Sequence, residues 1–498
     1  MIKHISFAVL MCLPSLFLGQ DQNIFHDRSF WENGPSVDAV KAEIEKGNDP
    51  VALTPSAFDA VVYAILGGAP TETIEYLLTI EGNEVDKTTH DGRNYLLWAG
   101  YKGNLEVMEL LYEKGSQADL VDDHGYNMMT FSAVGGNQNP AVYDMIMAKG
   151  GKVTDANRSG ATALHLITPY LEDASLLDYF VEKGLALETT DNAGNGLFNY
   201  AAQRGNMAMM KLLMEKGLDY QGINENGGNA MLFASRGGRG HTNDLAVFEY
   251  LEGLGLESDI VNFEGNTPLY YLAGSAEDEA IIDFFLEKGV NPNQVNKDGN
   301  TAFLNAVRYN NLPMAQKLAP MVKDMNQANH DGYTALTYAV MRNNTEAFEY
   351  LLAQGAKMDI EDAKGRNLVY HIFNSYRSRN AEAFASFLKV AEEHKLMMTP
   401  TYEGGNTLAH MAIAEGEMEL LQKALELGVD INQRNADGLT PLHLAAMKAK
   451  DKEMLAILLD KGAEKSILTD FEESAYDLAK ENEALSGNGI DVEFLKLD

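Results

Sequence analysis

A glycine that recurs at nearly constant spacing constrains this chain more than any other feature of its sequence. The positions are Gly92, Gly125, Gly160, Gly194, Gly227, Gly265, Gly299, Gly332, Gly365, Gly405 and Gly438. The steps between them are 33, 35, 34, 33, 38, 34, 33, 33, 40 and 33 residues. A fixed period of this size is typical of arrays in which each unit stacks on its neighbours. We therefore expect a solenoid rather than several separate globular domains.

The clearest copy of the repeat is 435–463, NADGLTPLHLAAMKAKDKEMLAILLDKGA. Its Asp437-Gly438 pair is a turn signal. Thr440-Pro441 favours the start of a helix, because Thr caps free N–H groups and Pro suits the first helical position. A second apolar run ends at Lys461-Gly462, which places a cation and a flexible residue at a helix end. The copy predicts turn, helix, turn, helix, and neither helix is long enough to be stable alone.

The same copy carries a family signature. Thr440-Pro441-Leu442-His443 matches the T-P-L-H motif of ankyrin repeats, whose period is about 33 residues. Partial matches lie at 162–165, 267–270 and 334–337. The chain therefore resembles the ankyrin-repeat family over nearly all of its length. The resemblance implies an all-α fold: an ankyrin-repeat solenoid of helix-turn-helix repeats with β-turn tips, forming one curved superhelix.

The repeat pattern divides the chain into four parts. We expect a signal peptide at 1–19, an N-terminal cap with degenerate repeats at 20–90, about eleven ankyrin repeats at 91–469, and a C-terminal cap at 470–498. In the N-terminal part, Thr54-Pro55 is expected to open a first helix. Two longer repeats place extra residues around 236–241 and 373–402, which are either functional insertions or drift in surface loops.

The first residues resemble a secretory signal peptide. Lys3 supplies a positive start, Ile5–Leu18 is an apolar run too short to span a bilayer, and Gly19 is a small residue suited to cleavage. We therefore expect an exported protein, either periplasmic or extracellular. Cys12 is the only cysteine, so the mature chain is expected to hold no disulfide and no cysteine–zinc site. No later apolar run is long enough for a transmembrane segment.

The net charge and the absence of catalytic motifs exclude some classes of function. The 73 acidic and 39 basic residues give a formal net charge of −34, which argues against nucleic acid as a partner. The acidity serves either solubility or a basic partner. The sequence lacks the H-E-x-x-H and G-x-S-x-G motifs, and we expect no catalytic residue, no metal site and no cofactor. The resemblance implies that His165, His410 and His443 tie neighbouring repeats together.

A contact surface also follows from the resemblance, because turn tips and inner helices of ankyrin repeats line a concave groove. The inner-helix ends form a basic and aromatic series, and Arg and Tyr are favoured interface anchors. With two turn-tip tyrosines, the candidate partner-binding residues are Tyr101, Lys102, Gln203, Arg204, Arg236, Arg308, Tyr309, Met341, Arg342, Met447, Lys448, Tyr126 and Tyr333. Further turn-tip residues are Arg93, Phe263, Lys297 and Arg366. The alternative is that cations simply favour helix C-termini.

These observations predict a non-catalytic, exported, monomeric scaffold that binds a partner protein through its concave face. One alternative is a dedicated accessory, inhibitor or immunity-type protein of an envelope or secreted enzyme, which would use the same surface for one client. A less favoured alternative is a glycan or peptide binder that uses tyrosines of the groove. Most methionines, such as Met209 and Met210, are expected to fill gaps in the core.

Overall fold

The computed structural model describes residues 23–238 and 240–497. They fall into two compact units, Met1–Glu225 and Asn226–Asp498. The predicted signal peptide at 1–19, with Cys12, lies outside the described residues.

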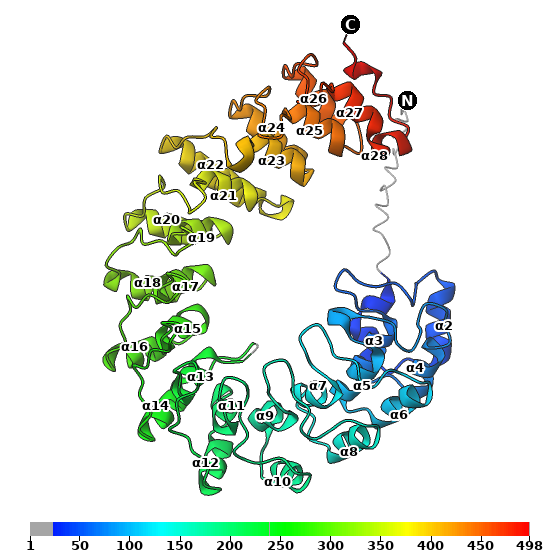
Figure 1. Ribbon diagram of the computed structural model, residues 1–498, viewed down its shortest axis with the longest axis vertical. Helices are drawn as coiled ribbons and strands as arrows, with labels where there is room; N and C mark the ends of the chain where they lie inside the picture. Colours follow the sequence, from blue (N-terminus) through cyan, green and yellow to red (C-terminus); the bar gives the residue numbers. More distant parts are fainter. Residues whose placement is uncertain (1–22, 239, 498) are drawn as a thin grey trace, which may run out of the picture. The chain divides into compact units, whose positions relative to one another are not determined.

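Unit 1 has two layers of helices (Figure 1). The first helix of each repeat packs on the first helix of the next, and these first helices are α1 (Arg28–Glu32), α3 (Ala60–Gly67), α5 (Tyr95–Lys102), α7 (Met128–Val134), α9 (Ala163–Ile167) and α11 (Leu197–Gln203). The second helices are α2 (Val37–Glu45), α4 (Thr71–Leu77), α6 (Leu105–Glu113), α8 (Pro140–Ala148), α10 (Ser175–Glu182) and α12 (Met207–Glu215).

Unit 2 repeats the same two-layer arrangement (Figure 1). Its first helices are α13 (Ala230–Arg236), α15 (Pro268–Ser275), α17 (Ala302–Arg308), α19 (Ala335–Met341), α21 (Leu368–Asn374), α23 (Leu408–Glu415), α25 (Pro441–Lys448) and α27 (Ala475–Glu481). Its second helices are α14 (Leu245–Gly253), α16 (Glu279–Glu287), α18 (Leu312–Leu318), α20 (Thr345–Ala353), α22 (Ala381–Glu393), α24 (Met418–Glu426), α26 (Glu453–Asp460) and α28 (Glu483–Gly487).

Short 3₁₀ helices fill some turns and connections. They are η1 (Ile24–His26), η2 (His90–Gly92), η3 (Thr168–Tyr170), η4 (Ala319–Met321), η5 (Ser378–Asn380), η6 (Glu403–Gly405) and η7 (Glu493–Leu495). Across residues 23–238 and 240–497, extended pairing is limited to isolated bridges, so the predicted all-α solenoid is confirmed.

In the regular repeats, turn and cap residues place the repeat boundary where the sequence predicts it. In the clearest copy, Thr440 caps α25 by accepting a hydrogen bond from the N–H of His443, and Pro441 occupies the first turn. The preceding turn is closed by Asn435, whose Oδ1 accepts from the N–H groups of Asp437 and Leu439 at 3.1 and 3.0 Å. Asn and Asp stabilise turns in this way because their short side chains reach the backbone two to four residues ahead.

The motif histidines join consecutive repeats, as the resemblance implies. His443 Nδ1 accepts a hydrogen bond from the Thr440 N–H at 3.1 Å, and its Nε2 donates to the carbonyl oxygen of Ile467 in the next turn at 3.0 Å. His165 and His410 make the equivalent bonds to the carbonyl oxygens of Thr189 and Leu439. Burial lowers the pKa of all three imidazoles, which keeps them neutral.

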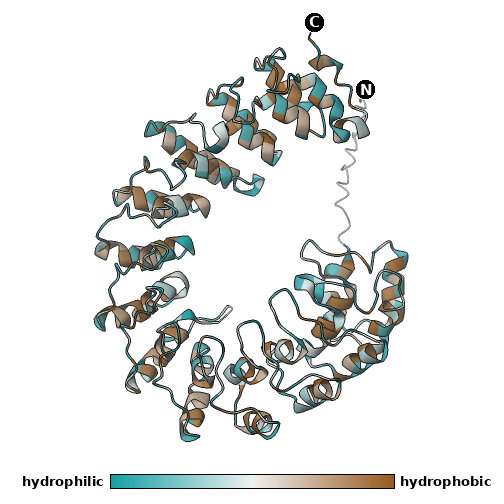
Figure 2. Ribbon diagram, in the orientation of Figure 1, coloured by the Kyte–Doolittle hydropathy of each residue, from teal (hydrophilic) through white to brown (hydrophobic). Residues whose placement is uncertain are grey.

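Apolar side chains fill the space between the layers. The first helices between the two ends of the described chain are buried over at least half of their length, whereas the terminal α1 and α27 are mostly not buried. The second helices bury one face, as Leu455 and Leu458 do in α26. Hydrophilic residues gather on loops and on the outer sides of the second helices (Figure 2). Met209 and Met210 are buried in α12, in agreement with a role in the core. No repeat can bury its own apolar face alone, so stability comes from stacking.

One prediction near the N-terminal end is wrong. Thr54-Pro55 does not open a helix, because it forms a turn in which the Thr54 hydroxyl accepts from the Phe58 N–H at 3.0 Å. Helix α3 begins only at Ala60, with Asp59 as its cap. At the other end, the second half of the closing repeat contains α28, capped by Asn482, and η7.

The two longer repeats use their extra residues differently. The 38-residue step lengthens the connection between α13 and α14, where Gly238 and His241 form a bridge. The 40-residue step adds η5 and extends α22 to 13 residues. Only part of that second insertion is therefore loop.

Candidate partner-binding surface

The turn tips of successive repeats are stacked through their backbones. The N–H of one tip donates to a carbonyl oxygen of the preceding tip, for example Lys297 to Glu264 and His330 to Asp298, both at 2.8 Å. The recurring glycine is required at this contact. Gly332 has a φ of +80°, and a Cβ there would lie 2.4 Å from the backbone nitrogen of Ala363 in the next tip. The glycine period thus marks where one turn passes against the next.

Side-chain amides add a second link between the tips. The amide of Asn296 donates to Asn266 Oδ1 at 2.9 Å, and that of Asn329 donates to Asn300 Oδ1 at 3.3 Å. Equivalent pairs join Asn224 to Asn195 and Asn435 to Asn406. The tips are therefore held in a row, and the residues just after each turn keep a defined place beside the first helices.

Eleven of the thirteen predicted contact residues lie at first-helix ends. The exposed ones are Lys102, Arg236, Tyr309, Met341, Arg342, Met447 and Lys448, and the half-buried ones are Tyr101, Gln203, Arg204 and Arg308. Tyr126 and Tyr333 lie half-buried between a turn glycine and a helix cap. The structure brings the residues of one repeat, and of adjacent repeats, onto a common side of each unit.

Three arginines of this surface stack on aromatic rings, one in η3 and two in first helices. The guanidinium carbon of Arg204 lies 4.9 Å from the ring centre of Tyr170, and that of Arg236 lies 5.9 Å from Tyr271. Arg308 lies 5.9 Å from the ring centre of Tyr338. Such cation–π contacts hold a guanidinium without neutralising it.

No carboxylate among the described residues forms an ion pair with Arg204, Arg236, Arg308 or Arg342. The single hydrogen bond that orients Arg342 runs from its Nε to the backbone oxygen of Arg308, at 2.5 Å. Arg204, Arg236 and Arg308 thus lie beside aromatic rings and not beside carboxylates, although the chain has 73 acidic residues. We define these four residues as the arginine set.

The cations at the second-helix ends behave differently. Six lysines at or near these ends pair with a carboxylate on the preceding second helix. The pairs are Lys114–Glu75 (3.2 Å), Lys149–Glu109 (3.7 Å), Lys183–Asp144 (2.6 Å), Lys216–Asp178 (2.7 Å), Lys288–Glu252 and Lys317–Asp283 (2.8 Å). We define these six residues as the lysine set. Lysine is therefore favoured at these helix ends by ion pairs between repeats as well as by the helix dipole.

The other turn-tip residues divide between structural and exposed roles. Arg93 is only 6% exposed, and it pairs with Asp91 and Asp122 at 3.0 and 2.7 Å, so it is part of the core and not a free tip. Lys297 pairs with Glu264 at 2.8 Å. Phe263 is 69% exposed and is therefore available for contact.

Arg366 belongs to a buried polar cluster in unit 2. Its Nε donates to Asp362 at 2.7 Å, and its terminal nitrogens donate to the hydroxyls of Tyr370 and Tyr333 at 3.3 and 3.2 Å. Burial opposes ionisation of Asp362, but bonds from the Arg366 and Lys364 N–H groups and from the Arg366 guanidinium hold its pKa below the usual range. Burial lowers the pKa of His371, 3.1 Å from the same carboxylate, to about 4.

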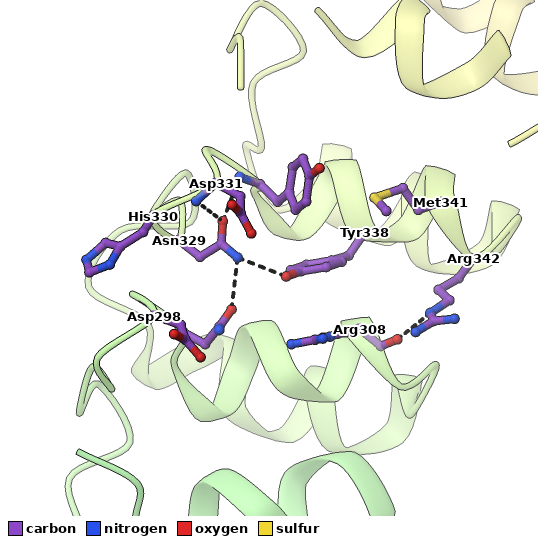
Figure 3. Close-up of a pocket in the computed structure, with 10 residues that line it drawn as sticks. Asp298, Arg308, Asn329, His330, Asp331, Tyr338, Met341 and Arg342 are labelled. Atoms are coloured by element: carbon purple, nitrogen blue, oxygen red, sulfur yellow. Dashed lines mark hydrogen bonds between the residues drawn. The ribbon is translucent and has the colours of Figure 1, made fainter. Parts of the chain in front are cut away.

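A pocket of about 480 Å³ opens between α17, α19 and two turn tips of unit 2 (Figure 3). Its lining residues are Asp298, Asn300, Arg308, Asn329, His330, Asp331, Tyr333, Tyr338, Met341 and Arg342. Four of them, Arg308, Tyr333, Met341 and Arg342, are among the predicted contact residues. Asn329 Nδ2 donates to the Tyr338 hydroxyl at 3.0 Å, and burial raises the pKa of that phenol, so it stays protonated.

Sequence reasoning missed the aromatic residues that hold the arginine set. Tyr271 and Tyr338 each lie four residues after the threonine that caps their helix. Trp98, Phe131 and Phe233 occupy the same place after their asparagine caps. This spacing is visible in the sequence and would have been a usable signal. The aspartates of the pocket carry no comparable signal, because aspartate is common at turn tips.

Within residues 23–238 and 240–497, no group of three or more His, Cys, Asp or Glu residues is placed to hold a metal ion. Over the same ranges, none of the helices combines the length and the apolar character that crossing a bilayer requires.

Two sequence profiles of known repeats match the chain. The profile described as "Ankyrin repeats (3 copies)" matches residues 61–155 and 269–362. The profile described as "Ankyrin repeats (many copies)" matches residues 198–252 and 409–459. Together the matches cover more than half of the chain.

Relatives with curated names share only short parts. Protein phosphatase 1 regulatory subunit 12A of Mus musculus is 35% identical over 80 residues, which are 16% of this chain and 8% of the relative. The probable palmitoyltransferase AKR2 of Saccharomyces uvarum is 36% identical over 75 residues, 15% of this chain and 10% of the relative. The BTB/POZ domain and ankyrin repeat-containing protein NPR1 of Malus hupehensis is 37% identical over 90 residues, 17% and 15%.

The chain thus spans less than a sixth of the length of these curated relatives. Among solved structures, the human ASB11 ankyrin repeat domain matches at 19% sequence identity with a TM-score of 0.38. That match covers 47% of this chain and 99% of the ASB11 chain.

Proposed function

Since the chain belongs to the ankyrin-repeat family, we propose that it is a non-catalytic scaffold that binds a partner protein through its first-helix ends and turn tips. The observation that carries the proposal is the arginine set, whose guanidinium groups pair with no carboxylate of the described chain. The regulatory-subunit name of the mouse relative agrees with a role in protein binding. The repeats supply the rigid frame, and the exposed residues supply the contacts.

Electrostatics support this surface over the rest of the molecule. An unpaired guanidinium on an aromatic ring offers several N–H donors in a fixed plane, and Arg and Tyr are common anchors at interfaces. Exposed Tyr309 and Met341 are chain neighbours of Arg308 and Arg342 and add apolar area there, and Met447 is exposed at another first-helix end of unit 2. The lysine set on the opposite helix layer offers less, because its charges are already neutralised by neighbouring carboxylates.

Affinity capture tests the proposal. The chain from Gln20 onward is immobilised beside an Arg204→Glu/Arg308→Glu/Arg342→Glu variant, and both are exposed to the same native cell-envelope extract. A protein retained by the first and lost by the second is purified, and its affinity for both chains is then measured. We expect at least about a hundredfold weaker binding by the variant, because a buried charged hydrogen bond is worth about 2–5 kcal/mol when broken.

A matched control reverses three charges of the lysine set, Lys183→Glu, Lys216→Glu and Lys288→Glu. This control should retain the partner, since these residues lie at second-helix ends. Equal loss by both variants, or no loss by either, would contradict the proposal. The stoichiometry of the complex separates the two forms of this function. A single client at one-to-one ratio favours a dedicated accessory or inhibitor protein, and several weaker clients favour a general scaffold.

We also propose that the scaffold is exported and monomeric. Lys3 followed by the apolar run Ile5–Leu18 supports export. Sequencing the N-terminus of the protein purified from its native source tests this: a start at or near Gln20 is expected, and an intact Met1 would overturn it. Sedimentation equilibrium tests the monomer.

A further inference from the structure

The pocket between α17 and α19 has opposite charges at its two ends, and we propose that it receives a mixed-charge peptide segment of the partner. An acidic side chain of the segment meets Arg308, Tyr338 and Arg342, and a basic side chain meets Asp298 and Asp331. This inference rests on the proposed protein-binding function and names the chemistry that one part of the surface recognises.

The helix end of the pocket is a set of hydrogen-bond donors. Tyr338 accepts its bond from Asn329, and its own proton faces no acceptor among the described residues. Arg308 stacks on the same ring. Arg342 uses its Nε on the carbonyl oxygen of Arg308, which orients the guanidinium and leaves the terminal nitrogens without an acceptor among the described residues (Figure 3). Two cations and a phenol are well suited to the two oxygens of a carboxylate.

The turn end of the pocket is anionic. Asp298 and Asp331 extend from successive turn tips and are exposed, and they form no ion pair with a basic side chain of the described chain. Figure 3 shows them on the side of the pocket opposite Arg342. A ligand that carried only negative charge would meet repulsion here, as it would from the net charge of −34. A nucleic acid is therefore disfavoured, and a segment with both charges is favoured.

Size and surroundings favour a peptide over a free ion. A volume of about 480 Å³ lies within the range of about 300–1,000 Å³ that is typical of sites for small organic ligands. Met341 lines the pocket and is 37% exposed, and Tyr309, next to Arg308 in the chain but outside the lining, is 58% exposed. A peptide that extends past the pocket can contact Tyr309 as well as Met341 while its charged groups remain inside.

Panning of a random heptapeptide phage library tests the proposal. The full chain from Gln20 is panned in parallel with its Arg308→Gln/Arg342→Gln variant. We expect the first to enrich sequences that hold an acidic and a basic residue. Synthetic versions of these peptides should bind about tenfold or more weakly when the acidic residue is replaced by Gln, or when the protein carries Arg308→Gln. Asp298→Asn/Asp331→Asn should weaken binding of the same peptides and reduce selection of the basic residue.

Controls keep the result interpretable. Arg379→Gln removes the same charge from unit 2 outside the pocket and should leave peptide affinity unchanged. Arg308→Lys retains the charge but not the planar fork, and it should bind with intermediate affinity. Circular dichroism verifies that each variant is folded. Enriched sequences that lack an acidic residue, equal binding to the Gln variants, or no enrichment would overturn the pocket assignment. The proposed function is tested separately by the capture experiment. It fails if no protein is retained by the parent chain and lost by the Arg204→Glu/Arg308→Glu/Arg342→Glu variant.

Discussion

The two helix layers of this protein place cations at the same local position and use them for different purposes. Helix C-termini attract positive side chains in both layers. At the second-helix ends, every member of the lysine set pairs with a carboxylate of the preceding repeat, as Lys183 does with Asp144. At the first-helix ends, three members of the arginine set stack on aromatic rings instead, and Arg342 donates to the backbone oxygen of Arg308. The position at a helix end therefore does not by itself decide the role of a cation. The role depends on which side chain of the adjacent repeat lies beside the cation.

The largest effect that tests this comparison is on binding. Arg308→Glu/Arg342→Glu should weaken the partner complex by about a thousandfold, because two unpaired donors become two repelling charges. Stability should change by less than about 0.5 kcal/mol, since neither guanidinium pairs with a carboxylate. Calorimetric titration and urea denaturation measure the two quantities. The reverse pattern, with lost stability and retained binding, would show that the arginine set is structural.

The next largest effect is the loss of stability in acid, which we expect to arise from histidines in the first-helix layer. Burial places the pKa of His371 at about 4 in the folded protein, below the value of about 6.5 in the unfolded chain. Protonation therefore favours unfolding. The stability that this group contributes is complete above about pH 6.5 and falls by about 1.4 kcal/mol per pH unit down to about pH 4. The motif histidines act in the same direction. Urea denaturation at several pH values measures the loss, and His371→Asn should reduce its slope.

The ion pairs of the lysine set should stay charged between pH 6.5 and 4. A hydrogen bond from Lys183 holds the pKa of Asp144 below its usual value, so this pair stays charged while the histidines are protonated. A Lys183→Met variant should therefore lose stability with the same pH dependence as the parent chain. A changed slope between pH 6.5 and 4 would place acid sensitivity in the second-helix layer and contradict this assignment.

Removing one motif histidine should have a smaller effect. His443→Ala leaves the Thr440 N–H and the Ile467 carbonyl oxygen without a partner at the joint between two repeats, and it should lower the unfolding free energy by about 2 kcal/mol. His394→Ala, at an exposed site in the same unit, serves as the control and should cost less than about 0.5 kcal/mol. Equal losses would contradict the inter-repeat role.

The smallest effect concerns single salt bridges. Lys183→Met should destabilise the protein by only about 0.5 kcal/mol in low salt, because the pair with Asp144 is partly exposed, and by less in high salt. Arg204→Met, at a first-helix end of the same unit, should show no such dependence on salt. Thermal denaturation at two ionic strengths measures both. A salt-dependent loss for Arg204 would remove the distinction between the sets.

Much of the fold was predictable because its signals are local. Turn glycines, threonine caps, proline at the first helical turn and Lys-Gly endings each depend on a few consecutive residues, and they repeat many times in phase. The one misplaced helix start, at Thr54-Pro55, lies in the N-terminal degenerate repeats, where the motif is degraded. At Thr54-Pro55 the same residue types that start a helix form a turn, since the backbone conformation of Ala57, with a φ of +57°, closes it.

By itself, the sequence determined the period, the family, the alternation of two helix types and the positions of the exposed helix ends. The tertiary structure decided which cation has a partner. Arg93 is buried between two aspartates, Lys183 meets Asp144, and Arg308 meets a tyrosine and an open pocket. These outcomes join residues about one repeat apart, so they depend on how far each repeat is shifted and rotated on the next. That geometry comes from the packing of all the apolar faces together, and no local pattern encodes it.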